Sequence, residues 1–245
     1  MNLRSKVLLR LKTKVKDFVE TPLLYKYPLF ISYPRSGAHW INSMMELYFN
    51  RPRLRRSRPT FLDKKRTDWM WIHDHDFYLK VIGRLKKMKS SRKILFLYRD
   101  PSEVIHSHLN SKYKNFDHYG YEYGKEYRNK RYVFSEASIL REIHDWVNYH
   151  KEYLEHHGNL RVTILKYENF LDKKKRLAEF RKICEHFNLP FDGGRISKIF
   201  KEYGKRDLDK NKKTGKEEYK KEKEEFLKKW RPLINRKVLE SGLRI

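Results

Sequence analysis

Cysteine is almost missing from this chain of 245 residues, because Cys184 stands alone and no disulfide can form within the chain. Cys184 falls in a stretch at 177–187 whose spacing predicts a helix. A lone thiol in such a stretch is ordinarily a buried side chain, and a chain without disulfides suits a reducing compartment. We therefore expect Cys184 to be buried.

Long apolar runs are missing as well. No window approaches the roughly 18 consecutive apolar residues of a membrane-spanning helix, and the N-terminus lacks the apolar core and cleavage site of a secretory signal. These absences predict a soluble, cytoplasmic protein. Residues 1–20 alternate apolar and basic residues at helical spacing, which fits a helix packed on its own domain or a peripheral contact with an anionic membrane surface.

Acidic residues are scarce beside basic ones: 31 Asp plus Glu stand against 58 Lys plus Arg, for a formal net charge of +27. Such a surface attracts nucleotides, acidic glycans, nucleic acid or anionic lipid. In the last third of the chain, solvated lysine-rich faces explain the same excess without any ligand. Hydrophobic residues at 39% and aromatic residues at 15% exclude a disordered chain and predict a folded core.

The length fits a single domain, with a basic N-terminal helix at 1–27, a core at 28–190 and a lysine-rich C-terminal region at 191–245. Short apolar runs bounded by turn residues predict strands, and helical spacing predicts helices between them. The strands are expected at 29–33, 69–73, 93–98 and 160–165, and the helices from 40, at 77–88, from 101, at 135–156 and at about 175–187. This alternation predicts an α/β fold with a central parallel β-sheet flanked by helices on both faces.

The C-terminal region has fewer sequence patterns that predict secondary structure. Lysine dominates from 198 to 229 and apolar residues are few, which predicts a flexible loop running into a polar helix. The apolar residues of 230–234 are expected to dock back on the core.

Residues 29–49 have the layout of a phosphate-binding loop: a buried strand, a tight glycine-containing loop and a helix. Gly37 lets the backbone approach a phosphate, Arg35 supplies a fixed positive charge, and Ser36 and His39 can donate hydrogen bonds. The Gly-Lys-Ser/Thr ending of nucleotide-triphosphate loops is missing, as is a clear magnesium-binding acid after the next strand. The chemistry is therefore expected to use side-chain charge instead of a metal ion.

A second strand-to-helix junction carries Arg99 and, two helical turns later, Ser107. Asp100 or Ser102 is suited to cap the helix that follows, with Pro101 in its first turn. Arg99 alone would be explained as a surface arginine beside a carboxylate. Two such strand-to-helix junctions in order along one chain favour a phosphate-binding site more strongly than either junction alone.

Together these segments resemble the family of sulfotransferases that use PAPS (3′-phosphoadenosine 5′-phosphosulfate). Residues 33–40 match the family's phosphosulfate loop, Tyr-Pro-Lys-Ser-Gly-Thr-Thr-Trp, except that Arg35 replaces lysine and Ala38 and His39 replace the threonines. At least one hydroxyl contact to the 5′-phosphate is thereby lost, and His39 is the candidate to supply another. Residues 99–107 resemble the family's 3′-phosphate motif, and 167–168 resemble its Tyr-Glu pair.

The resemblance implies that the loop binds the phosphosulfate, that Arg99 and Ser107 bind the 3′-phosphate and that Tyr167 lies near the adenine. The family's C-terminal Arg-Lys-Gly-x-x-Gly signature is not cleanly present, and Lys213 and Gly215 are its nearest candidates. The expected donor-binding set is Arg35, Ser36, Gly37, Ala38, His39, Trp40, Arg99, Ser107, Tyr167, Lys213 and Gly215. PAPS is the expected donor and PAP (3′-phosphoadenosine 5′-phosphate) the product, with no metal required.

The resemblance also implies a histidine base after the second strand, where His73 and His75 both stand. His73 aligns better with the family histidine, and Asp74 or Asp76 is suited to fix its tautomer. We expect in-line transfer in which one of these imidazoles takes the acceptor proton and Arg35 stabilises the departing phosphate. A metal site at 73–76 is a weaker alternative, because successive residues of a strand point to opposite faces.

The predicted function is transfer of a sulfuryl group to a hydroxyl of a glycan, lipid or small molecule, with no specific nucleic-acid partner. Carbohydrate is favoured because arginines at 51–66 suit an anionic glycan, while Trp69, Trp71 and the tyrosines of 113–132 suit stacking. A phosphate-loop nucleotide kinase is an alternative, although its loop ending is missing. A non-catalytic basic protein that binds nucleic acid or membrane explains the charge but not both phosphate motifs.

Overall fold

The computed structural model describes residues 27–54, 67–74, 93–114, 134–154, 161–204 and 216–243. The helices expected at 1–20 and 77–88 lie outside these residues, as does most of the tyrosine-rich segment at 113–132. Three expected site residues also lie outside them: His75, Lys213 and Gly215.

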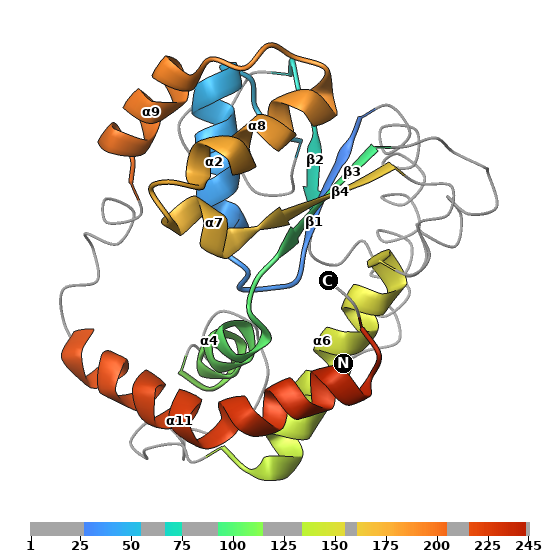
Figure 1. Ribbon diagram of the computed structural model, residues 1–245, viewed down its shortest axis with the longest axis vertical. Coiled ribbons are helices and arrows are strands. Elements are labelled where there is room, and N and C mark those ends of the chain that lie inside the picture. The colour runs from blue at the N-terminus through green and yellow to red at the C-terminus, as the bar shows by residue number, and fades with distance from the viewer. Residues whose placement is uncertain are drawn as a thin grey trace, which may run out of the picture.

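Four parallel strands form one sheet in the order β2-β1-β3-β4 (Figure 1). The strands are β1 (Leu29–Ser32), β2 (Ile72–Asp74), β3 (Lys93–Tyr98) and β4 (Arg161–Lys166). Phe30 lies between His73 and Leu95 in the registers of β1 with its two neighbours. The central strands β1 and β3 are almost wholly apolar, as expected for parallel strands buried on both faces.

Helices cover both faces of the sheet (Figure 1). One layer contains α2 (Ala38–Phe49), α7 (Tyr167–Leu171), α8 (Arg176–Phe187) and α9 (Gly193–Glu202), and the other contains α4 (Pro101–Lys114), α6 (Glu136–Leu154) and α11 (Lys216–Glu240). Alternation along the strands divides the core between the layers: Phe30 and Leu95 pack towards α2, and Ile31 and Phe96 pack towards α6. The predicted α/β fold is confirmed.

The second strand begins three residues later than expected, at Ile72. The residues before Ile72 pair with residues 52–54 instead. The N–H of Met70 donates to the carbonyl of Pro52, and the N–H of Leu54 donates to the carbonyl of Trp71. The β propensity of residues 69–71 therefore predicted backbone pairing correctly, but their partner is the segment at 52–54 and not the main sheet.

The C-terminal region is more helical than expected. Residues 198–202 belong to α9, whose first turn is capped by the Asp192 carboxylate accepting from the N–H of Arg195 at 2.9 Å. Residues 216–240 form one helix that continues through Pro232. Ile234 is fully buried, so the segment 230–234 does pack on the core as predicted.

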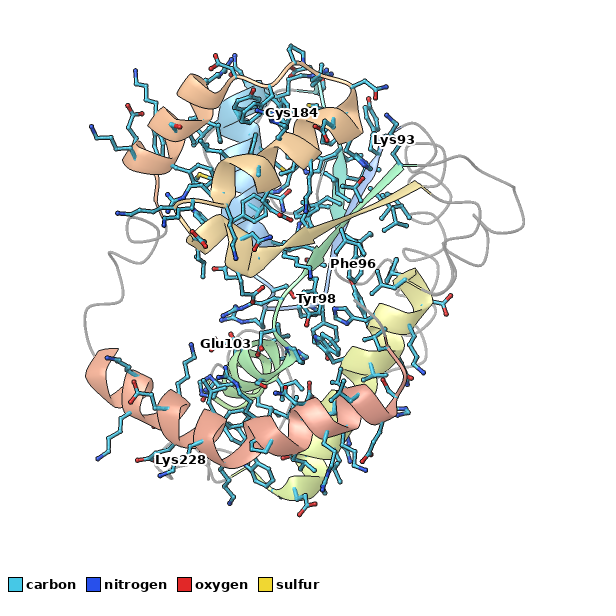
Figure 2. The ribbon with its side chains drawn as sticks, in the orientation of Figure 1. Lys93, Phe96, Tyr98, Glu103, Cys184 and Lys228 are labelled. Atoms are coloured by element: carbon cyan, nitrogen blue, oxygen red, sulfur yellow. The ribbon has the colours of Figure 1, made fainter. Side chains whose placement is uncertain are left out.

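Cys184 lies on α8 and is buried, as expected, and its burial raises the pKa of the thiol (Figure 2). Among the residues that the structure describes, no helix is long and apolar enough to cross a membrane.

Candidate nucleotide-binding site

The loop between β1 and α2 turns sharply at two residues with left-handed backbone, Arg35 (φ 71°) and Gly37 (φ 88°). The N–H of Ser36 donates to the carbonyl of Tyr33 at 3.2 Å, which closes the turn. The carbonyl of Gly37 accepts from Trp40 and Ile41 in the first turn of α2. The earlier N–H groups of α2 are therefore left at the mouth of the loop, the usual arrangement for binding an anion.

Gly37 cannot be replaced without disturbance. A Cβ built on Gly37 would overlap the ring of Tyr167, the first residue of α7, and its positive φ also disfavours side chains. Tyr167 is buried, and the guanidinium carbon of Arg99 lies 4.7 Å from the centre of its ring. The residue that follows β4 thus packs against the loop and supports it.

Ser36 is fully buried, and among the described residues its hydroxyl oxygen makes no hydrogen bond. A buried hydroxyl without a partner costs about 1–3 kcal/mol. Such an atom in a phosphate-binding loop fits a ligand that supplies the missing partner.

Three predicted residues from two distant segments meet beside this loop. The Nε of Arg35 donates to the hydroxyl of Ser107 at 3.2 Å, and Arg99 donates from Nη1 to the carbonyl of Arg35 at 2.9 Å. Arg99 therefore braces the loop while its guanidinium lies over the ring of Tyr167. The structure brings Arg35, Arg99, Ser107 and Tyr167 into one connected group.

The start of α4 carries the second half of the site. Asp100 caps the helix by accepting from the N–H of Glu103 at 3.0 Å, and Pro101 occupies the first turn as predicted. Glu103 pairs with Arg99 at 3.2 Å and with Lys223 of α11 at 2.6 Å. Arg231 of α11 lies 3.7 Å from Glu103 and 4.0 Å from Asp100. Figure 2 shows Glu103 on α4 and Tyr98 at the end of β3.

These cations control the ionisation of Glu103. Burial alone would raise the pKa of its carboxyl, but the hydrogen bond and charge of Lys223, together with Arg99 and Arg231, lower it. Lys223 was not predicted, because the lysine-rich run at 198–229 was explained by solvation, and Arg231 was not singled out within the segment expected to dock on the core. The signal available in the sequence was the spacing of Phe226, Trp230 and Leu233, whose side chains pack on or against the core.

Ala38, His39 and Trp40 have different surroundings. Ala38 and Trp40 are buried, and the indole Nε1 of Trp40 donates to the carbonyl of Tyr203 at 3.4 Å. Only His39 is exposed. Ala38 can therefore serve a ligand only through its backbone N–H group, and Trp40, whose N–H donates to Gly37, only by supporting the loop.

His73 is 1% exposed, and its Nε2 lies 3.4 Å from the hydroxyl of Ser32. Its ring lies 5.3 Å from that of Phe30 and 6.4 Å from that of His39. Within the described ranges, no three side chains of His, Cys, Asp or Glu come together as metal ligands.

Two expected acceptor contacts, those of Trp71 and Arg53, are wrong because both side chains are buried. Trp71 is fully buried and its indole donates to Asn42 at 2.7 Å, so no face is free to stack on a sugar. Arg53 is buried against Glu46 at 3.2 Å, and Arg51 donates to the carbonyls of Asp68 and Trp69. These two arginines hold the segment after α2 in place.

The architecture and the site define a class: a parallel α/β protein with a phosphate-binding loop after its first strand. The sulfotransferase domain matches residues 28–240 of the chain. The chain therefore belongs to the sulfotransferase domain family, which confirms the resemblance found in the sequence.

A solved structure supports this fold. Mouse sulfotransferase SULT7A1 complexed with PAP is similar over 78% of this chain and 70% of its own, with 17% identity and a TM-score of 0.52. A retinol dehydratase in complex with androsterone and inactive cofactor PAP is similar over 94% of this chain and 87% of its own, with 14% identity and a TM-score of 0.49. No curated protein gives a significant match to the sequence.

Proposed function

We propose that the chain transfers a sulfuryl group from PAPS to an acceptor hydroxyl. The observation that carries the proposal is the link from Arg35 through Ser107 and Arg99, which joins the loop to the second phosphate motif. Membership of the sulfotransferase domain family supports the reaction, and PAP bound to the similar mouse enzyme supports the donor.

The residues present fit the two anionic ends of this donor. The amides at the start of α2, with Arg35, Ser36 and His39, would hold the phosphosulfate. Arg99 and Ser107 would hold the 3′-phosphate. Because Tyr167 is buried between Gly37 and Arg99, we assign it the task of shaping the loop and orienting Arg99.

The reaction needs one bond made, one bond broken and one proton moved. The acceptor oxygen bonds to sulfur, the bond between sulfur and the 5′-phosphate oxygen breaks, and PAP leaves. Arg35 stabilises the negative charge that gathers on that oxygen, and positioning by the loop supplies much of the remaining acceleration by analogy with phosphoryl transfer.

We assign the acceptor proton to one of the two histidines, His73 or His75. His73 is buried and directed at Ser32, which favours His75 as the base and gives His73 a supporting position. Replacing His75 by alanine should lower turnover by about 100-fold or more and remove the acidic limb of the pH–rate profile. If His73→Ala has that effect and His75→Ala does not, the assignment is reversed.

We propose a carbohydrate hydroxyl as the acceptor, supported by the cationic character of the chain and by Trp69, which is only partly buried. The decisive assay combines radiolabelled PAPS with glycan, lipid and phenolic acceptors. Before that, PAP without magnesium should raise the melting temperature of the protein, whereas ATP with magnesium should not. A larger stabilisation by ATP with magnesium would indicate a kinase, and no stabilisation by either nucleotide would exclude both enzymes.

A further inference from the structure

The long C-terminal helix α11 packs directly on α4, which follows Arg99 and carries Ser107, the two expected 3′-phosphate residues. Phe226 of α11 is buried with its ring 4.8 Å from that of His106. This anchor lies between Lys223 and Arg231, which both reach the first turn of α4. The helix is thus held by an apolar contact and presents two cations to the same end of α4.

The positions on α4 place these cations beside the donor motif. Glu103 lies one turn before Ser107 on α4, so these two share a face, and Arg99 stands just before the helix and pairs with Glu103. Glu103 contacts Arg99, Lys223 and Arg231 at once. The cationic face around Arg35 and Arg99 therefore continues onto α11.

Arg231 and Lys223 are held differently. Lys223 is tightly paired with Glu103 at 2.6 Å, whereas Arg231 reaches its carboxylates only at 3.7 and 4.0 Å and its side chain is 44% exposed. A guanidinium offers five donors in a planar fork, which suits phosphate. Arg231 retains donors for a further anion, while Lys223 keeps the carboxylate of Glu103 in place.

We propose that α11 is part of the donor site: Arg231 binds the 3′-phosphate beside Arg99 and Ser107, and Glu103 with Lys223 positions it. The inference rests on the proposed function, because it requires a ligand with a 3′-phosphate. The proposal adds a residue of α11 to Lys213 and Gly215, the C-terminal residues that the sequence suggested for the donor site.

The test compares two nucleotides that differ only in the 3′-phosphate, PAP and 5′-AMP. Isothermal titration calorimetry on the full chain gives the ratio of their dissociation constants. Any loss of folded protein weakens both nucleotides equally and cancels in this ratio. The wild-type protein should prefer PAP by about 100-fold or more, and Arg231→Ala should reduce that preference about tenfold.

Arg236→Ala is the matched control, because Arg236 lies on the same helix and pairs at 3.8 Å with the exposed Glu240, away from the first turn of α4. It should keep the wild-type preference, and Lys223→Ala should lose part of it. No preference for PAP in the wild-type protein would overturn the proposed function. A normal preference in Arg231→Ala, or an equal loss for both nucleotides, would overturn the present inference alone.

Discussion

The two ends of the proposed donor site are built in different ways. At the loop end, Arg35 accompanies backbone amides, a buried hydroxyl and a glycine packed against Tyr167. At the start of α4, Arg99, Lys223 and Arg231 surround the carboxylates of Glu103 and Asp100.

The difference shows what each end depends on. The loop end binds through shape and through dipoles that the backbone holds fixed, so small steric changes should damage it. The α4 end binds through long charged side chains that carboxylates hold in position, so it should tolerate steric change and respond to pH. Single substitutions at each end test this difference.

The largest effect is expected for turnover in Arg35→Ala. Loss of the cation that stabilises the departing phosphate should lower kcat by about 100- to 1,000-fold, measured with radiolabelled PAPS and the best acceptor of the panel. PAP affinity should fall far less, and Arg35→Lys should restore much of the rate because it keeps the charge. Unchanged turnover in Arg35→Ala would mean that the loop end holds no leaving group.

Gly37→Ala should weaken PAP binding by about 100-fold, because the added methyl displaces Tyr167 and strains the left-handed backbone. Gly242→Ala is the control: Gly242 has a comparable φ of 76°, but no atom lies within 4 Å of where its Cβ would stand. Calorimetry should find its PAP affinity unchanged. Equal PAP affinities in Gly37→Ala and Gly242→Ala would contradict the steric explanation of why the loop needs a glycine.

Ser36→Ala should lower PAP affinity about five- to tenfold, because the ligand loses one hydrogen bond. The melting temperature of the free protein should stay equal or rise, since the removed hydroxyl has no partner among the described residues. Ser43→Ala provides the comparison, as its hydroxyl donates to the carbonyl of His39 at 2.9 Å. A loss of stability in Ser36→Ala with unchanged PAP binding would assign Ser36 to folding.

The smallest effect concerns the pH dependence of stability at Glu103. The folded protein lowers the pKa of Glu103 below its ordinary value of about 4.5, so the ionised carboxylate stabilises the fold above that pH. This stabilisation is lost as the pH falls through the lowered pKa. Glu103→Gln should melt earlier at neutral pH and show a shallower decline on acidification.

Glu240→Gln is the control for that experiment. Its carboxylate also has a lowered pKa, through the hydrogen bond from Lys237, but the side chain is exposed and its loss should change the melting curve very little. Identical pH profiles for Glu103→Gln and the wild-type protein would show that the ionic group at α4 does not stabilise the fold.

Much of the sheet and of the donor motif was predictable because it depends on local patterns. The continuous apolar runs of β1 and β3 are typical of parallel strands buried on both faces, so adjacent residues were enough to predict these strands. Gly37 and the cap at Asp100 followed from backbone requirements within a few residues. The short helix α7 and the length of α11 were missed, because packing on distant elements decides them.

The sequence by itself determined the order of the strands, the phosphate-binding loop and the family of the chain, since each depends on adjacent residues. Only the tertiary structure decided which side chains surround those motifs. It buried Trp71 and His73, paired Arg53 with Glu46, and brought Lys223 and Arg231 to Glu103. Burial and charge pairing depend on residues far apart along the chain, so local patterns do not reveal them.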